Sequence, residues 1–133
     1  MNLLLDTHFI VWLTDHPDRL TAAEKALIFD AGNVVSVSAV SIWEIRIKWQ
    51  YVYRSGQRKI ETPPDAVLRL VDALALPLLP LTGEVAAATL HASIPHRDPF
   101  DELLLVQAQE GGLRLLTRDE LLVSHPLAWT AAA

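Results

Sequence analysis

The apolar positions of the chain form short continuous runs, separated by longer segments in which they recur with helical spacing. A continuous run such as Leu3-Leu4-Leu5 is typical of a strand buried on both faces of a parallel sheet. One later run contains Pro77 and Pro80, which confine it to a sheet edge or to an irregular segment. Strands are therefore predicted at residues 2–5, 33–37, 76–81, 113–116 and 129–130.

Cap residues mark the starts of the helical segments. Thr21 with Glu24 three residues later has the sequence of a capping box, and Asp98 before Pro99 is a favourable N-cap. Thr82 is placed to cap an alanine-rich helix. Helices are predicted at residues 9–13, 20–31, 38–51, 64–74, 82–91 and 98–110, with a loop at 53–64 and a helical turn at 119–123.

The alternation of strands and helices predicts the architecture. It favours a three-layer α/β/α sandwich around a central, mostly parallel sheet. The length of 133 residues fits one domain, residues 1–133, which is large enough to bury a core. Folds of this kind bind ligands at the carboxyl ends of the strands, so the functional site is expected at that edge of the sheet.

Four acidic residues are expected at this edge. Asp6 and Asp119 come directly or soon after predicted strands, Glu44 follows another strand, and Asp101 lies in the first turn of a helix. Crowded carboxylates repel each other unless a cation compensates, and carboxylate oxygens suit Mg²⁺ or Mn²⁺. The chain contains no cysteine, so any metal must be held by oxygen or imidazole ligands.

Most of these acids also have an ordinary structural explanation. Asp98 suits an N-cap, and Asp101 three residues later suits a capping box or the helix dipole. Glu44 could form an ion pair with Lys48 one helical turn later. Asp6 is the least easily explained in this way, because it is polar at the point where a buried strand ends.

The charge of the chain is unevenly distributed. A net charge of -5 argues against general attraction to nucleic acid, yet no acid lies between Ile45 and Ile60. This basic segment, residues 46–59, interleaves cations with aromatic residues, which suits phosphate contacts and base stacking on single-stranded RNA. The alternative is a solvated helix face with its aromatic residues packed inward. In the first case, the RNA contacts would come from Arg46, Lys48 and Arg54.

Histidine and tryptophan residues near the acids are expected to have structural roles. No histidine pair has the spacing of a zinc site, so His8 and His96 are not predicted as metal ligands. Trp12 and Trp43 are expected to fill the core.

Four short motifs give the chain a family resemblance. They are LLDTH at residues 4–8, SAVSIWEI at 38–45, HRDPFD at 96–101 and LLTRD at 115–119. In this order and combination they resemble the PIN-domain family and, within it, the toxins of VapBC-type toxin–antitoxin pairs. Each motif alone is weak, but together they extend over nearly the whole chain.

The resemblance implies roles for the acids. In the family, four such acids form a pocket for Mg²⁺ or Mn²⁺, which assigns Asp6 and Asp101 as direct ligands. Glu44 and Asp119 would bind through water or help to deprotonate the nucleophile. Two further residues of the motifs would assist: Asp98 as an outer or alternative ligand and Thr117 as a hydroxyl near the metal.

The resemblance also implies an activity and partners. It predicts a toxin that is a metal-dependent endoribonuclease and hydrolyses RNA phosphodiester bonds with a metal-activated water. A small antitoxin and a homodimer are implied as partners. The sequence has no secretory signal and no apolar stretch long enough for a membrane span, so a cytoplasmic protein is expected.

Two other classes of function are compatible with the residues alone. One is a phosphatase with Asp6 as its nucleophile, although Asp6-Thr7-His8 lacks a second acid two residues on. The other is a non-catalytic binding module whose acids only cap helices. Stabilisation by Mn²⁺ would distinguish a metal site from a set of capping residues.

Overall fold

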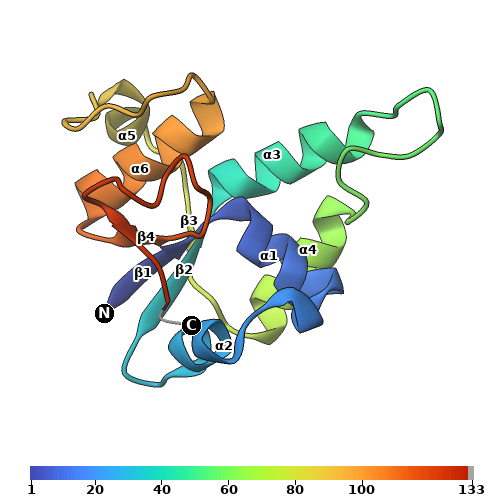
Figure 1. Ribbon diagram of the computed structural model, residues 1–133, viewed down its shortest axis with the longest axis horizontal. Coiled ribbons are helices and arrows are strands. Elements are labelled where there is room, and N and C mark those ends of the chain that lie inside the picture. Colours follow the sequence, from blue (N-terminus) through green and yellow to red (C-terminus); the bar gives the residue numbers. More distant parts are fainter. Residues whose placement is uncertain (132–133) are drawn as a thin grey trace.

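A five-stranded parallel sheet forms the centre of the molecule in the computed structural model, which describes residues 1–131 (Figure 1). The strand order is β3-β2-β1-β4-β5, so the short strand between Pro77 and Pro80 lies at an edge, as its sequence predicts. The strands are β1 (Asn2–Leu5), β2 (Val34–Ser38), β3 (Leu78–Leu79), β4 (Arg114–Leu116) and β5 (Ala128–Trp129).

Helices cover both faces of the sheet. Because side chains alternate along a strand, Leu3 and Leu5 of β1 pack with α1, α2, α3 and α4, whereas Leu4 packs with α6. The predicted three-layer α/β/α fold is confirmed (Figure 1). The helices are α1 (Thr7–Asp15), α2 (Ala22–Phe29), α3 (Ala39–Gln50), α4 (Pro64–Ala73), α5 (Gly83–Ala87) and α6 (Pro99–Gly111), with a short 3-10 helix at Pro17–Arg19.

The predicted caps are present at three helices. Thr21 and Glu24 form a reciprocal capping box at α2, and Thr82 accepts a hydrogen bond at the start of α5. Asp98 accepts hydrogen bonds from two backbone amides at the start of α6. These local signals fixed the helix starts correctly.

Two expectations about helical segments are wrong. The helix predicted to reach His91 ends at Ala87, because Gln109 of α6 takes over the next backbone groups: its side chain accepts from His91 N and donates to Thr89 O. Trp43 is 47% exposed, so it does not fill the core, whereas Trp12 is half-buried against it.

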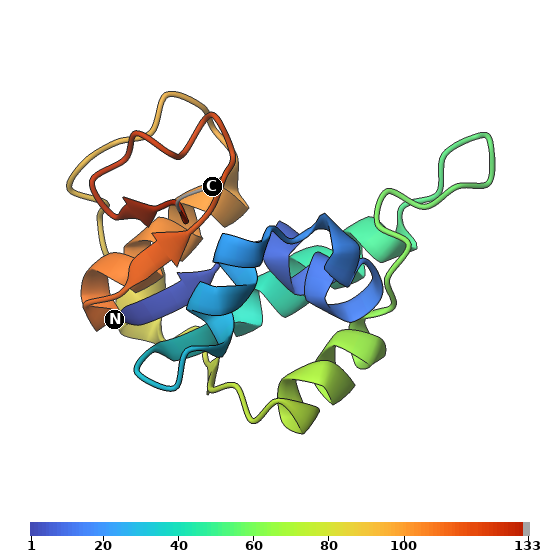
Figure 2. The same cartoon turned by 60° about the horizontal axis from the view of Figure 1, so that its bottom comes forward.

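The predicted loop after α3 contains a hairpin. Val52 and Arg58 form an antiparallel bridge, and Tyr53 N donates to Gln57 O. Gly56, at the tip, has a φ of 88°, a conformation that favours glycine. This hairpin projects from the body of the molecule at the end of α3 (Figure 2). Among residues 1–131, no helix is long and apolar enough to cross a membrane.

Candidate active site

Four acids lie at the carboxyl ends of the central strands, and we call them the carboxylate rim: Asp6, Glu44, Asp101 and Asp119. Asp6 follows β1, while Asp119 is in the turn after β4. Glu44 and Asp101 come from α3 and α6, which flank this edge of the sheet (Figure 1). The negative charges are close enough to act on one another, because Glu44 and Asp119 raise the pKa of Asp6.

Asp6 is a buried carboxylate, with 4% of its surface exposed. Burial is the main reason that its pKa is raised, and the charges of Glu44 and Asp119 add to it. A hydrogen bond from Thr117 Oγ1 to Asp6 Oδ2, 2.7 Å long, and the charge of His8 lower the pKa and oppose this effect. Within residues 1–131, Asp6 forms no ion pair, and its Oδ1 accepts no hydrogen bond from a side chain.

Asp101 has a different environment at the start of α6. Its Oδ2 lies 2.9 Å from His96 Nε2. Burial, followed by the charges of Asp98 and Asp6, raises the pKa of Asp101 to about 6, although the contact with His96 lowers it. The Asp98 carboxylate caps the helix by accepting from Phe100 N and Asp101 N. The structural explanation for Asp98 is therefore confirmed.

Glu44 is held by hydrogen bonds at both carboxylate oxygens. Thr7 Oγ1 donates to Oε1 over 2.7 Å, and Lys48 Nζ forms an ion pair with Oε2. The expected ion pair with Lys48 is thus present. The ammonium group of Lys48, which the sequence analysis considered for RNA binding, is therefore paired with Glu44. Thr7 was not predicted as a site residue. The one signal for it in the sequence is its position directly after Asp6.

Thr117 joins the end of β4 to the rim. Its hydroxyl accepts from Asp119 N at 3.1 Å and donates to Asp6 Oδ2, so one buried side chain orients two of the acids. The Asp119 Oδ1 atom accepts from Leu121 N at 2.9 Å, which closes the turn. Thr117 therefore lies beside Asp6 and Asp119, and its role as a hydroxyl near the metal stays a prediction.

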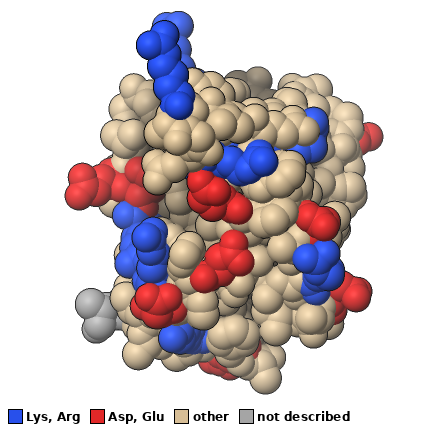
Figure 3. Space-filling model, turned by 90° about the vertical axis from the view of Figure 1, so that its right-hand side faces the viewer, with Lys and Arg blue, Asp and Glu red and all other residues tan. Residues whose placement is uncertain are grey.

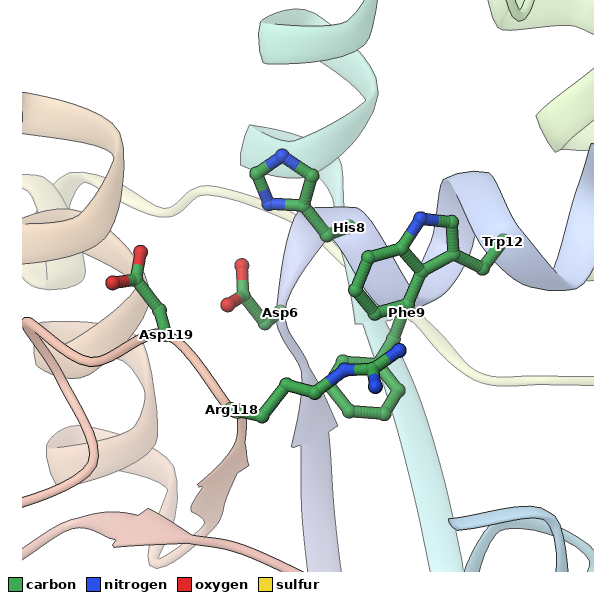
Figure 4. Close-up of a pocket in the computed structure, with 6 residues that line it drawn as sticks. All are labelled: Asp6, His8, Phe9, Trp12, Arg118 and Asp119. Carbon is green, nitrogen blue, oxygen red and sulfur yellow. The ribbon is translucent and has the colours of Figure 1, made fainter. Parts of the chain in front are cut away.

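A cavity of about 330 Å³ opens beside Asp6 and Asp119. Both acids are among its lining residues, and Figure 4 shows the Arg118 guanidinium beside the aromatic rings of Phe9 and Trp12, on the side of Asp6 away from Asp119. Arg118 was not predicted as a site residue, although its place between Thr117 and Asp119 offered a signal. The remaining lining comes from His8, Phe9 and Trp12 of α1.

The donor chemistry of the rim fits a hard divalent cation. In the part of the chain that the structure describes, no three carboxylate or imidazole side chains are arranged to hold one metal ion together. Mg²⁺ does not require such a cage, because it is bound through one or two carboxylates together with water and substrate phosphates. Asp6 is buried and Asp101 is half-buried. Burial is the main reason that the pKa of each is raised, and neighbouring acids add to it.

The basic segment does not form a continuous positive surface. Arg58 is used internally: its guanidinium stacks on Trp49 at 4.1 Å and donates to Trp49 O. Arg46 and Arg54 are exposed, and within residues 1–131 their side chains form no ion pair. Figure 3, which views the molecule from the side of the hairpin, shows basic and acidic side chains interspersed.

Comparison with known proteins agrees with this fold. The PIN domain family model matches residues 3–125. A protein named Ribonuclease VapC22, from Mycobacterium tuberculosis (strain ATCC 25618 / H37Rv), is 33% identical over 127 residues, which cover 92% of this chain and 91% of the relative.

Two solved structures share the fold at low sequence identity. VapBC2 from Rickettsia felis, bound to a DNA fragment from its promoter, gives a TM-score of 0.60 at 13% identity, covering 98% of this chain and 97% of the other. FitAB bound to the IR36 DNA fragment gives 0.56 at 20% identity, covering 96% and 94%. At these identities, the likeness concerns the fold alone.

Proposed function

The chain belongs to the PIN-domain family, and from this premise we propose that it is a metal-dependent endoribonuclease, the toxin of a toxin–antitoxin pair. The relative that is 33% identical is named a ribonuclease, which supports RNA as the substrate. The observation that carries the proposal is Asp6, a buried carboxylate without an ion-pair partner among residues 1–131, beside an open cavity. Burying such a charge is costly unless a cation accompanies it in the working state.

In this proposal, Asp6 and Asp101 hold the divalent ion, Mg²⁺ or Mn²⁺. The bound ion supplies a water of lowered pKa and offsets the negative charge that develops on the phosphate. Thr117 donates a hydrogen bond to Asp6 Oδ2, which would leave Oδ1 of this carboxylate available to hold the ion. The His96 side chain holds Asp101 in the same way through Oδ2.

The other two acids have supporting roles in the proposal. Asp119, whose backbone amide is bound by Thr117, accepts a proton from the attacking water or orients it. Glu44 acts through water, because both its oxygens are held by Thr7 and Lys48. Asp98 keeps α6 in place as its N-cap and thereby positions Asp101.

Purified protein, free of any antitoxin, tests the activity directly. Single-stranded RNA should be cleaved in Mn²⁺, and a chelator should abolish the cleavage. Asp6→Asn should reduce the rate at least about a hundredfold. The matched control is Asp65→Asn, since Asp65 is exposed on α4 and far from the rim in sequence. A wild-type protein that binds no Mn²⁺ and cleaves no RNA would instead be a non-catalytic module.

The proposed partners follow from the family. The chain resembles VapBC-type toxins and shares its fold with VapBC2, so we propose a small antitoxin for this chain and a homodimer as its assembly. We place its action in the cytoplasm with its RNA substrate. Light scattering of the purified protein would measure the oligomeric state, and a monomer at micromolar concentration would contradict the dimer.

A further inference from the structure

The cavity beside Asp6 and Asp119 extends beyond the rim over the first helix. Its volume of about 330 Å³ falls within the range of small-molecule sites. The carboxylates form one wall, and the opposite wall is built from rings and a guanidinium, as Figure 4 shows. Nothing in the proposed metal chemistry needs this second wall.

The second wall is held in place by packing and hydrogen bonds. The Trp12 ring packs on Phe9, whose side chain is buried, with the ring centroids 5.5 Å apart. His8 lies one helical turn before Trp12, 5.9 Å away and tilted by 37°. Both rings therefore face the cavity from the same side of α1.

Arg118 completes this wall from the strand side. Its guanidinium carbon lies 4.2 Å from the Trp12 ring centroid, and it donates to Arg19 O at 2.7 Å. Its Nε lies 3.6 Å from Glu24 Oε2. An arginine fixed in this way offers a flat cationic surface without first having to be ordered.

We propose that this cavity is a subsite for one base of single-stranded RNA, the nucleotide next to the cleaved phosphate. The proposal rests on the proposed RNA cleavage and names where the substrate binds. Unpaired bases stack on aromatic rings and arginine planes, and the cation suits the adjacent phosphate. The carboxylates at the opposite wall exclude an acidic occupant unless a divalent ion accompanies it. In this arrangement, Trp12 and Arg118 bind the base, while His8 covers its edge.

Steady-state cleavage of a single-stranded oligoribonucleotide in Mn²⁺ tests the subsite. Trp12→Leu should raise KM about tenfold while kcat changes less than about twofold. The substitution removes a surface on which the base stacks and leaves the acids of the rim unchanged. Trp12→Phe should restore most of the affinity. Arg118→Gln and His8→Ala should raise KM by smaller factors. The matched control is Trp129→Leu, a tryptophan 40% exposed on the edge strand β5.

The outcomes separate this proposal from the one on which it rests. If the wild-type protein cleaves RNA and the Trp12, Arg118 and His8 variants keep its KM, the subsite is wrong and the cleavage proposal stands. In that case the cavity would bind a different ligand, such as a peptide segment of a partner protein. If the wild-type protein cleaves no RNA, both proposals fail. Should Trp12→Leu not fold, His8→Ala decides, because His8 is exposed and its loss does not open the core.

Discussion

The carboxylate rim and the basic segment differ in how the fold holds their charges. The rim is assembled by long-range contacts, such as the hydrogen bond from Thr117 to Asp6 between opposite ends of the chain. The basic segment is built by local ones, such as Lys48 on Glu44 and Arg58 on Trp49. The rim thus holds buried acids without full compensation, whereas two cations of the basic segment are half-buried and bound within the fold.

This difference indicates where function is concentrated. A buried charge in a fixed position is costly to the fold, and such a cost is typical of functional sites. Exposed cations contribute little to stability and lose their attraction as salt increases. Substitutions in the rim should therefore act strongly on activity, and substitutions in the basic segment should act gradually on binding.

The largest expected effect comes from Asp101→Asn. The variant removes a proposed metal ligand, so the rate of RNA cleavage in Mn²⁺ should fall at least about a hundredfold. Asp98→Asn keeps an N-cap oxygen and should retain most of the activity. Single-turnover cleavage measures both rates. Equal losses in the two variants would show that the start of α6, rather than the Asp101 carboxylate, matters.

The second effect concerns the ion pair that connects the two regions. Lys48→Met leaves the Glu44 side chain, 5% exposed, without its cation, and the free energy of unfolding should fall by about 2 kcal/mol. Mn²⁺ should raise the melting temperature more in this variant than in the wild type, because the ion then compensates a larger charge.

Chemical denaturation measures the free energy of unfolding of Lys48→Met, and thermal unfolding with and without Mn²⁺ measures the shift in melting temperature. The control is Lys25→Met, since Lys25 is exposed on α2 and no ion pair of it is found within residues 1–131. A Lys48→Met variant as stable as the wild type would mean that Glu44 does not depend on Lys48.

Local signals predicted much of the fold from the sequence. The buried strand at Leu3-Leu4-Leu5, the capping box at Thr21 and the cap at Asp98 depend only on neighbouring residues, and each was predicted correctly. The end of α5 was not, because the Gln109 side chain, distant in sequence, binds the backbone that would have continued the helix. Local propensity cannot indicate such a competitor.

The same distinction holds for the candidate site. Asp6 and Asp119 could be placed at one edge because the ends of parallel strands determine where they lie. Arg118 was missed, since its contact with Trp12 appears only when the turn after β4 packs against α1. The pairing of Lys48 was considered from its spacing, but only the fold shows that the pair is nearly buried.

The third effect is the pH dependence of the metal-free protein. The pKa of Asp101 is raised to about 6, so the folded state binds a proton more tightly than the unfolded chain. The resulting stability is fully present below the ordinary carboxyl pKa and is lost as the pH rises through about 6. The burial of Asp6 raises its pKa and acts in the same direction.

Urea titrations of metal-free protein between pH 4 and about 7 measure this loss. Asp101→Asn should flatten the dependence, and Mn²⁺ should oppose it, because the ion binds the deprotonated form. The opposite result would be a stability that rises with pH across this range, equally in the wild type and in Asp101→Asn. It would contradict the raised carboxylate pKa values at the rim.

The smallest effect is expected from the exposed cations of the basic segment. Arg46→Gln and Arg54→Gln should each raise KM for RNA about two- to threefold at low salt, with kcat retained, because each removes one attraction to phosphate. The difference should shrink as salt is added. Arg69→Gln is the control, since Arg69 is an exposed arginine of α4 outside the segment. Values of KM equal to the wild type at low salt would make the segment a solvated surface, and all RNA binding would then lie at the rim and its cavity.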